Sequence, residues 1–182
     1  MNARRPLSAA VALLLAFAIP VRAVTAIPEI TVIDIYPGGD NASYALDKGT
    51  AGQVAVGNRL FFSADNASGS TQLWVSDGTT SGTHLVKTLS PSGADEVSQI
   101  VAFGDSVMFR ANDEAHGIEL WISDGTESGT HMVRDINTVV DEEAGDGRTF
   151  NSYPQNLYLW GSVLYFAADD GINGVELWKS DG

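Results

Sequence analysis

Apolar residues stand next to one another in many short segments of this chain, instead of alternating with polar ones. Such pairs are Phe61-Phe62, Leu73-Trp74, Leu120-Trp121, Tyr165-Phe166 and Leu177-Trp178. Because successive side chains of a β-strand point to opposite faces of its sheet, these pairs predict strands that are covered on both faces. Beyond residue 26, no apolar period of 3.6 residues extends over the length of a helix. The pattern therefore predicts an all-β fold.

One sequence unit recurs three times along the chain. The approximate limits of the copies are 53–89, 100–136 and 157–182. The first two copies align without a gap, and Trp74, Trp121 and Trp178 occupy equivalent positions, 47 and then 57 residues apart. The ten additional residues fall in the polar segment NTVVDEEAGDGRTFNSYPQ between the second and third copies, which is typical of an enlarged loop.

Turn signals divide each copy into four short strands. The strands expected in the first copy are 54–56, 59–64, 72–76 and 83–89. Gly57-Asn58 is a two-residue hairpin signal, because glycine adopts the positive φ that such turns require. Asp77-Gly78 marks the later turn, where a carboxylate can accept hydrogen bonds from backbone N–H groups.

Four strands per repeat and burial on both faces together indicate β-propeller blades, stacked face to face. Three blades would form an incomplete ring, because propellers typically have about four to eight. Residues 30–36 resemble the end of a copy and are expected to form an outer strand without its own blade. The third copy stops at Gly182 inside the turn that the other copies continue, so we expect a longer repeat protein.

The first 26 residues differ in kind from the rest and resemble a secretory signal peptide with a short apolar helix. Arg4 and Arg5 precede an uncharged apolar run from Leu7 to Ile19, and Pro20 ends it. A run this short is not expected to act as a transmembrane segment. We therefore expect a signal peptide over 1–26, a β-propeller-like repeat region over 27–182, and a secreted or cell-surface product.

The motif shared by the copies resembles that of a known repeat family. It occurs as QLWVSDGTTSGT, ELWISDGTESGT and ELWKSDG. These segments are similar to the bacterial secreted repeats named after their ELWxxDGT motif, which have been compared with hyalin-type repeats. The resemblance covers residues 30 to 182 and implies tandem, propeller-like repeats on exported or surface-associated proteins. It implies no particular reaction. The first copy departs from the motif with Gln72 in place of glutamate.

Composition narrows the possible functions. The 182 residues include ten Lys and Arg, twenty-three Asp and Glu, and no Cys, for a net charge of −13. Removal of residues 1–26 would leave a net charge of −16. Such a chain is expected to repel nucleic acid, which binds through Lys and Arg. Without cysteine it has no disulfide, no thiolate nucleophile and no Cys-ligated zinc.

Acidic residues gather in the loops expected on one rim of the ring, including those between the second and third strands. The residues expected to bind a partner there are Asp113, Glu114, His116, Asp169 and Asp170. Clustered carboxylates also suit calcium, but no loop reproduces the ligand spacing of a calcium loop. We interpret the repeated Trp and Asp-Gly positions as packing and turn residues, with sugar stacking by the Trp rings as the alternative.

The function that these patterns favour is a non-catalytic binding or adhesion scaffold for a protein, glycan or matrix partner. An extracellular hydrolase or lyase on a propeller scaffold is one alternative, and a calcium-stabilised structural array is another. No P-loop, nucleophile elbow or dinucleotide fingerprint is present in the sequence, so no catalytic residue is assigned.

Overall fold

The computed structural model describes residues 52–65, 70–93 and 95–182. All of these residues belong to one compact unit of the chain. The expected signal peptide and the expected outer strand 30–36 lie outside the described residues. No helix in the described part is long and apolar enough to cross a membrane.

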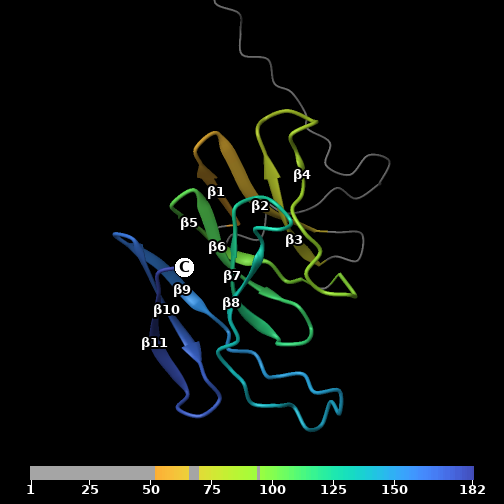
Figure 1. The fold of residues 1–182 in the computed structure, drawn as a ribbon, viewed down its shortest axis with the longest axis vertical. Helices are drawn as coiled ribbons and strands as arrows, with labels where there is room; N and C mark the ends of the chain where they lie inside the picture. Colours follow the sequence, from red (N-terminus) through yellow and green to blue (C-terminus); the bar gives the residue numbers. More distant parts are fainter. Residues whose placement is uncertain (1–51, 66–69, 94) are drawn as a thin grey trace, which may run out of the picture. The chain divides into compact units, whose positions relative to one another are not determined.

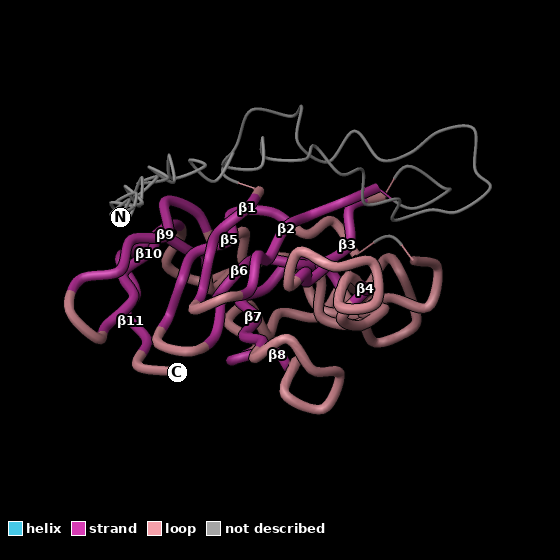
Figure 2. The backbone as a smooth tube through the Cα atoms, turned by 90° about the horizontal axis from the view of Figure 1, so that it is seen from above, coloured by secondary structure: helices cyan, strands magenta, loops and turns pink. Residues whose placement is uncertain are grey.

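The described residues form eleven strands in three antiparallel sheets (Figure 1). The first sheet contains β1 (Gln53–Val56), β2 (Arg59–Asp65), β3 (Thr71–Ser76) and β4 (His84–Leu85). The second contains β5 (Ser98–Phe103), β6 (Ser106–Asn112), β7 (Ile118–Ser123) and β8 (His131–Arg134). The third contains β9 (Gln155–Trp160), β10 (Val163–Asp169) and β11 (Val175–Ser180). Figure 2 shows strands and loops but no helix in the described part, so the all-β prediction is confirmed.

Each sheet is a meander whose strands pair in chain order. The first hairpin of every sheet turns at a glycine with positive φ: Gly57 at 60°, Gly104 at 60° and Gly161 at 63°. A side chain at these positions would be strained, which explains why the three copies share the residue. The turn signals in the sequence thus place the first hairpins correctly.

The fourth strand of the first copy is shorter than expected. We predicted a strand over 83–89, but β4 comprises only His84 and Leu85, followed by one further bond from Val86 N–H to the Leu73 carbonyl. Farther along, the Leu89 N–H donates to the Asp95 carboxylate instead of to β3. A buried carboxylate therefore replaces the strand pairing at this point. The strand prediction was therefore wrong for residues 83 and 86–89.

The middle sheet is covered on both faces, as the adjacent apolar pairs predict. On β6, Phe109 belongs to a first core with Phe61 and Val75 of the first sheet. Its neighbour Met108 belongs to a second core with Leu164 of the third sheet. Leu120 and Trp121 of β7 divide between the two cores in the same way. Neighbouring positions on one strand thus join three sheets into two packed interfaces.

The repeated Asp-Gly corner stabilises the turn that follows the third strand. Asp77 accepts hydrogen bonds from the backbone N–H and hydroxyl of Thr79 at 2.9 and 2.7 Å, and these lower the pKa of Asp77. A Cβ on Gly82 would lie about 2.0 Å from the Asp77 carboxylate, so a side chain there would displace Asp77 from these contacts. Asp124 and Thr126 repeat these contacts in the second sheet.

Each of the two interfaces between sheets also contains one buried carboxylate, and we call these two groups clasps. In the first clasp, Asp95 accepts hydrogen bonds from the backbone N–H groups of Leu89 and Ser90 at 3.0 and 2.9 Å, and Gln72 of β3 donates to it at 3.4 Å. Asp95 is fully buried. Because a buried charge requires several donors, this contact fixes the path between the first and second sheets.

The second clasp occupies the positions equivalent to Gln72 and Asp95, but its carboxylate comes from the opposite side of the interface. Glu119 of β7 replaces Gln72, and Ser152 replaces Asp95. Glu119 accepts hydrogen bonds from the Ile136 N–H at 3.1 Å and from the N–H and hydroxyl of Ser152 at 3.0 and 2.5 Å. Burial raises the pKa of Glu119 to about 7. Each interface thus holds one carboxylate, contributed once by the loop and once by the third strand.

The repeated tryptophans lie within the packed sheets, whereas a fourth tryptophan does not. Trp121 is buried, and Trp74 and Trp178 are half-buried. The indole N–H of Trp178 donates to the Ala168 carbonyl at 3.1 Å. Trp160, which the sequence pattern does not single out, is 71% exposed.

Candidate functional site

The loop between β6 and β7 and the long segment between β8 and β9 meet at an open cavity of about 460 Å³. The segment between β4 and β5 contributes Pro91 to its wall. The other lining residues are Asp113, Glu114, Ala115, His116, Asp135, Asp146, Gly147, Arg148 and Thr149. We call this cavity the rim pocket.

Asp113 organises the loop between β6 and β7. Its Oδ1 accepts hydrogen bonds from the backbone N–H groups of Ala115 and His116, at 3.1 and 2.7 Å. Its Oδ2 lies 2.7 Å from Nδ1 of His116, and this hydrogen bond raises the pKa of His116. At the start of the same loop, Asn112 accepts a hydrogen bond from the Glu114 N–H at 2.8 Å. These short-range contacts are typical of Asx turns and fix the three polar side chains within this loop.

Backbone contacts hold the long segment between β8 and β9 against this loop. The Thr149 N–H donates to the Ala115 carbonyl at 3.0 Å, and the Ile118 N–H donates to the Asn151 side chain at 2.6 Å. Gly117, with φ of 68°, lies so close to Asn151 that a Cβ would approach its side-chain oxygen to 2.5 Å. The insertion between the second and third copies therefore forms one wall of the rim pocket.

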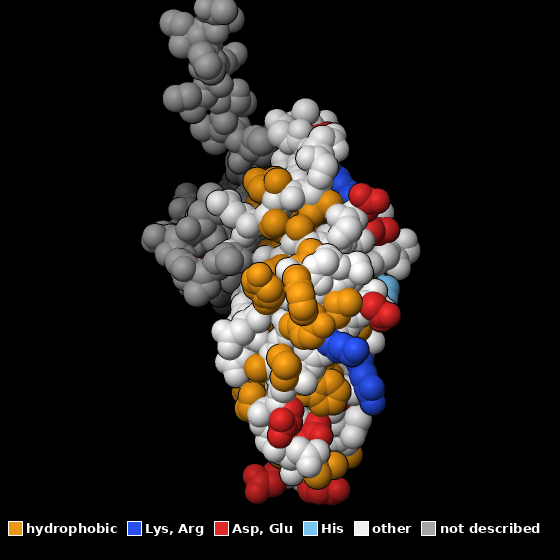
Figure 3. Space-filling model, turned by 90° about the vertical axis from the view of Figure 1, so that its left-hand side faces the viewer, with side chains coloured by type: hydrophobic (Ala, Val, Ile, Leu, Met, Phe, Trp, Pro, Cys, Tyr) orange, Lys and Arg blue, Asp and Glu red, His pale blue; other side chains and the backbone are white. Residues whose placement is uncertain are grey.

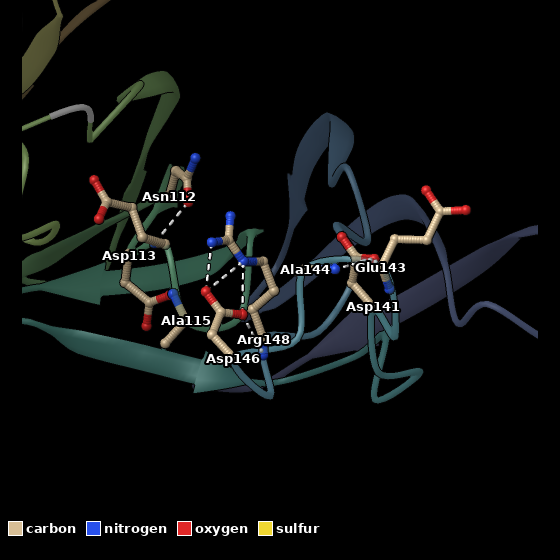
Figure 4. Close-up of polar contacts among 9 residues, drawn as sticks. Asn112, Asp113, Ala115, Asp141, Glu143, Ala144, Asp146 and Arg148 are labelled. Carbon is tan, nitrogen blue, oxygen red and sulfur yellow. Dashed lines mark hydrogen bonds and ion pairs between the residues drawn. The ribbon is translucent and has the colours of Figure 1, made fainter.

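Within that wall, Arg148 and Asp146 form an exposed ion pair (Figure 4). The guanidinium Nη2 lies 2.5 Å from Oδ2 of Asp146, and the Arg148 hydrogen bond lowers the pKa of Asp146 to about 2. Figure 4 shows Asp146 and Arg148 between the Asp113 loop and Asp141, which accepts hydrogen bonds from the N–H groups of Glu143 and Ala144. The guanidinium charge is therefore paired within its own loop.

A third segment reaches the rim pocket through Glu114. This glutamate, with φ of 68°, accepts hydrogen bonds from the backbone N–H and the hydroxyl of Ser92, between β4 and β5. The rim pocket thus combines residues from three segments far apart in sequence.

The carboxylates of the rim pocket exceed its cations. Asp113 is paired with His116 and Asp146 with Arg148, which leaves the carboxylates of Glu114 and Asp135 without a cation among the lining residues. Two buried oxygen atoms of the lining residues, Oδ1 of Asp135 and Oγ1 of Thr149, have no hydrogen-bond partner. The excess of carboxylates gives the rim pocket a negative potential.

The structure brings together three of the five residues that the sequence singles out. Asp113, Glu114 and His116 line the rim pocket, whereas Asp169 and Asp170 do not. Asp170 accepts hydrogen bonds from the N–H groups of Ile172 and Asn173, and these lower its pKa. Asp169 accepts a hydrogen bond from the Gly171 N–H at 2.7 Å. Both aspartates cap the turn between β10 and β11.

Sequence reasoning missed Asp135 and Arg148. Asp135 follows β8 directly, and Arg148 lies in the insertion, which has no counterpart in the other copies to align it with. The signal that could have found Arg148 is the insertion itself, because added residues between repeats must be accommodated at the rim.

The described residues provide neither an evident metal centre nor a nucleophilic triad. No group of three or more His, Asp or Glu side chains among them is placed to hold a metal ion. His116 has a carboxylate at Nδ1, but in this part of the chain no hydroxyl is hydrogen-bonded to its other ring nitrogen.

No protein-family model, curated protein or solved structure matches this chain.

Proposed function

We propose that this chain is an exported, non-catalytic binding scaffold of the β-propeller type, and that its rim pocket binds a positively charged group of a protein partner. The signal-like pattern of residues 1–26 supports export. The blade-like arrangement is supported by the middle sheet, where Met108 and Phe109 pack against different neighbouring sheets.

The observation that carries the proposal is the charge balance of the rim pocket. His116 and Arg148 each have an acidic partner 2.7 and 2.5 Å away, respectively, so the remaining carboxylates attract an additional cation. A lysine or arginine side chain of a partner supplies both positive charge and N–H groups that can donate hydrogen bonds to the lining carboxylates. A glycan brings donors but no charge.

Binding to a basic peptide tests this function. Isothermal titration calorimetry on the full chain, with an oligolysine peptide as the probe, is expected to show binding that weakens as salt is raised, because salt screens exposed charges. The Glu114→Gln/Asp135→Asn variant is expected to bind about tenfold more weakly, equivalent to about 1.4 kcal/mol.

The matched control removes two acids outside the rim pocket. Asp169→Asn/Asp170→Asn changes the net charge equally but leaves the pocket intact, so its affinity is expected to stay near that of the parent chain. Equal loss of affinity in both double variants would show a diffuse charge effect and would contradict a specific pocket. Binding of neutral maltohexaose in preference to the peptide would point to a glycan instead.

A further inference from the structure

The third sheet has an apolar outer face that the described residues leave uncovered. Tyr158 is 68% exposed, Trp160 71% and Leu177 77%. Figure 3 views the molecule from the side of β9–β11 and shows hydrophobic side chains gathered on this face. Exposed apolar patches of this kind often mark interaction sites.

The repeat alignment identifies what covers the same positions elsewhere. In the second sheet, the counterparts of Tyr158, Trp160, Tyr165 and Leu177 are Val101, Phe103, Met108 and Leu120. All four belong to the second core, against the third sheet. In the first sheet, the counterparts Phe61 and Leu73 belong to the first core, against the second sheet. Each of these faces is therefore covered by the sheet of the following unit.

The covering face is also the same at both interfaces. The third sheet presents Leu164, Phe166 and Ala168 to the second core, and the second sheet presents the counterparts Val107, Phe109 and Ala111 to the first. From this repetition we propose that the outer face of β9, β10 and β11 is an interface for a further sheet of the same repeat, joined to β11 by a fourth strand and presenting this leucine, phenylalanine and alanine face.

The area of the patch argues for a covalently continuous sheet over a second copy of the chain. The large apolar side chains exposed on this face, Tyr158, Trp160, Val175 and Leu177, offer roughly 500 Å², whereas a stable interface between separate proteins buries about 800 Å² of polar and apolar surface on each partner. A tethered sheet avoids most of the entropic cost of association, so a smaller patch suffices.

The two clasps predict the type of residue that the further sheet places opposite Glu176. Glu176 of β11 is the counterpart of Glu119 and is exposed. Because each existing interface contains a single carboxylate, the incoming sheet should bring a neutral residue such as Ser152 to Glu176, and not an aspartate such as Asp95.

An extended chain tests the interface. Asp181-Gly182 aligns with Asp124-Gly125, so a copy of residues 126–182 added after Gly182 continues the repeat in register. The parent sequence has no cysteine, so Tyr158→Cys introduces a single thiol on the outer face. In the extended chain, this thiol is expected to react with a maleimide at least about tenfold more slowly than in the parent, and the Tm is expected to rise by roughly 5 °C.

The controls distinguish a further sheet of the repeat from a second copy of the chain as the group that covers this face. Ser128→Cys, on an exposed turn of the second sheet, is expected to react equally in both chains. Changing the copied Ser152 to aspartate is expected to abolish the rise in Tm, and Glu176→Gln is expected to restore it. An added unit that stays unfolded, or one that folds without slowing the reaction at position 158, overturns the proposal. Protection of that thiol in the parent chain that increases with protein concentration also overturns it, because the occupant is then a second copy.

Discussion

In both clasps a carboxylate accepts hydrogen bonds from buried backbone N–H groups, but the carboxylate comes from opposite sides of the interface. At the first clasp, Asp95 from the connecting segment accepts hydrogen bonds from two backbone N–H groups and from the Gln72 side chain. At the second, Glu119 from the third strand accepts the equivalent Ile136 N–H, and Ser152 donates to it. Glutamate has the longer side chain and reaches the buried backbone N–H group from the third strand. The shorter aspartate reaches the equivalent N–H group from the connecting segment.

Each interface thus contains one buried carboxyl group, and the two interfaces differ in which side contributes it. A carboxylate among backbone N–H groups is stabilised by charge-assisted hydrogen bonds. Two carboxylates at one site would repel each other, and none would leave buried donors unpaired. The pairings Gln72 with Asp95 and Glu119 with Ser152 are thus alternatives of equal net charge.

The largest expected effect comes from placing both carboxylates at one interface. Ser152→Asp adds an aspartate beside the buried Glu119 and is expected to lower the free energy of unfolding by about 3 kcal/mol at pH 7. Urea denaturation measures the change. The matched control is Glu119→Gln/Ser152→Asp, which reproduces the first clasp and should recover most of the loss. A double variant no more stable than Ser152→Asp would refute the exchange rule.

Removing the carboxylate of the first clasp should have a smaller effect. Asp95→Ala leaves the N–H groups of Leu89 and Ser90 buried without an acceptor, which is expected to cost about 2 kcal/mol of unfolding free energy. The exposed Asp105→Ala serves as the control and should change stability by less than about 0.5 kcal/mol. Equal stability of the two variants would show that Asp95 is not needed at the interface.

The clasps should also differ in their response to pH. The pKa of Glu119 is raised to about 7 in the folded chain, so the folded state binds a proton that the unfolded state releases near pH 4.5. The stability contributed by this proton is fully present below pH 4.5 and is lost as the pH rises toward 7. We expect the unfolding free energy of the parent, relative to Glu119→Gln, to fall by about 1 kcal/mol for each pH unit over that range. A constant difference would contradict the raised pKa.

The smallest effect concerns the rim pocket. Asp113→Asn removes the carboxylate that raises the pKa of His116, so the pKa of this imidazole should fall toward 6.5. Proton NMR of the imidazole resonances across about pH 5–9 measures it, and His131 provides an internal reference on the exposed part of β8. An unchanged His116 titration would show that the 2.7 Å contact with Asp113 does not form in solution.

Much of the fold follows from the sequence because its signals are local. The adjacent apolar residues Leu120 and Trp121 lie in different cores, and glycines such as Gly57 and Gly104 mark hairpins by their positive φ. The shortened β4 was missed because it depends on Asp95, which lies ten positions beyond Leu85 and accepts the hydrogen bond from the Leu89 N–H.

The rim pocket was less predictable. Asp113, Glu114 and His116 could be singled out because they share one short loop. Arg148 and Asp135 join them only through contacts made by the insertion, such as that from Thr149 to Ala115, which no pattern within one copy reveals. The clasps escaped notice for the same reason, since Gln72 and Glu119 appear in the sequence only as variants of one motif position.

The stacking of three sheets through opposite faces is tested most directly by methyl NMR. Apart from the initiator, the chain contains only Met108 and Met132, so selective ¹³C labelling of methionine methyl groups gives resolved probes. Nuclear Overhauser effects are expected from Met108 to second-core residues such as Leu164 and Phe166, and from Met132 to first-core residues such as Val86. Contacts from both methyl groups to one and the same core would contradict the stacked arrangement.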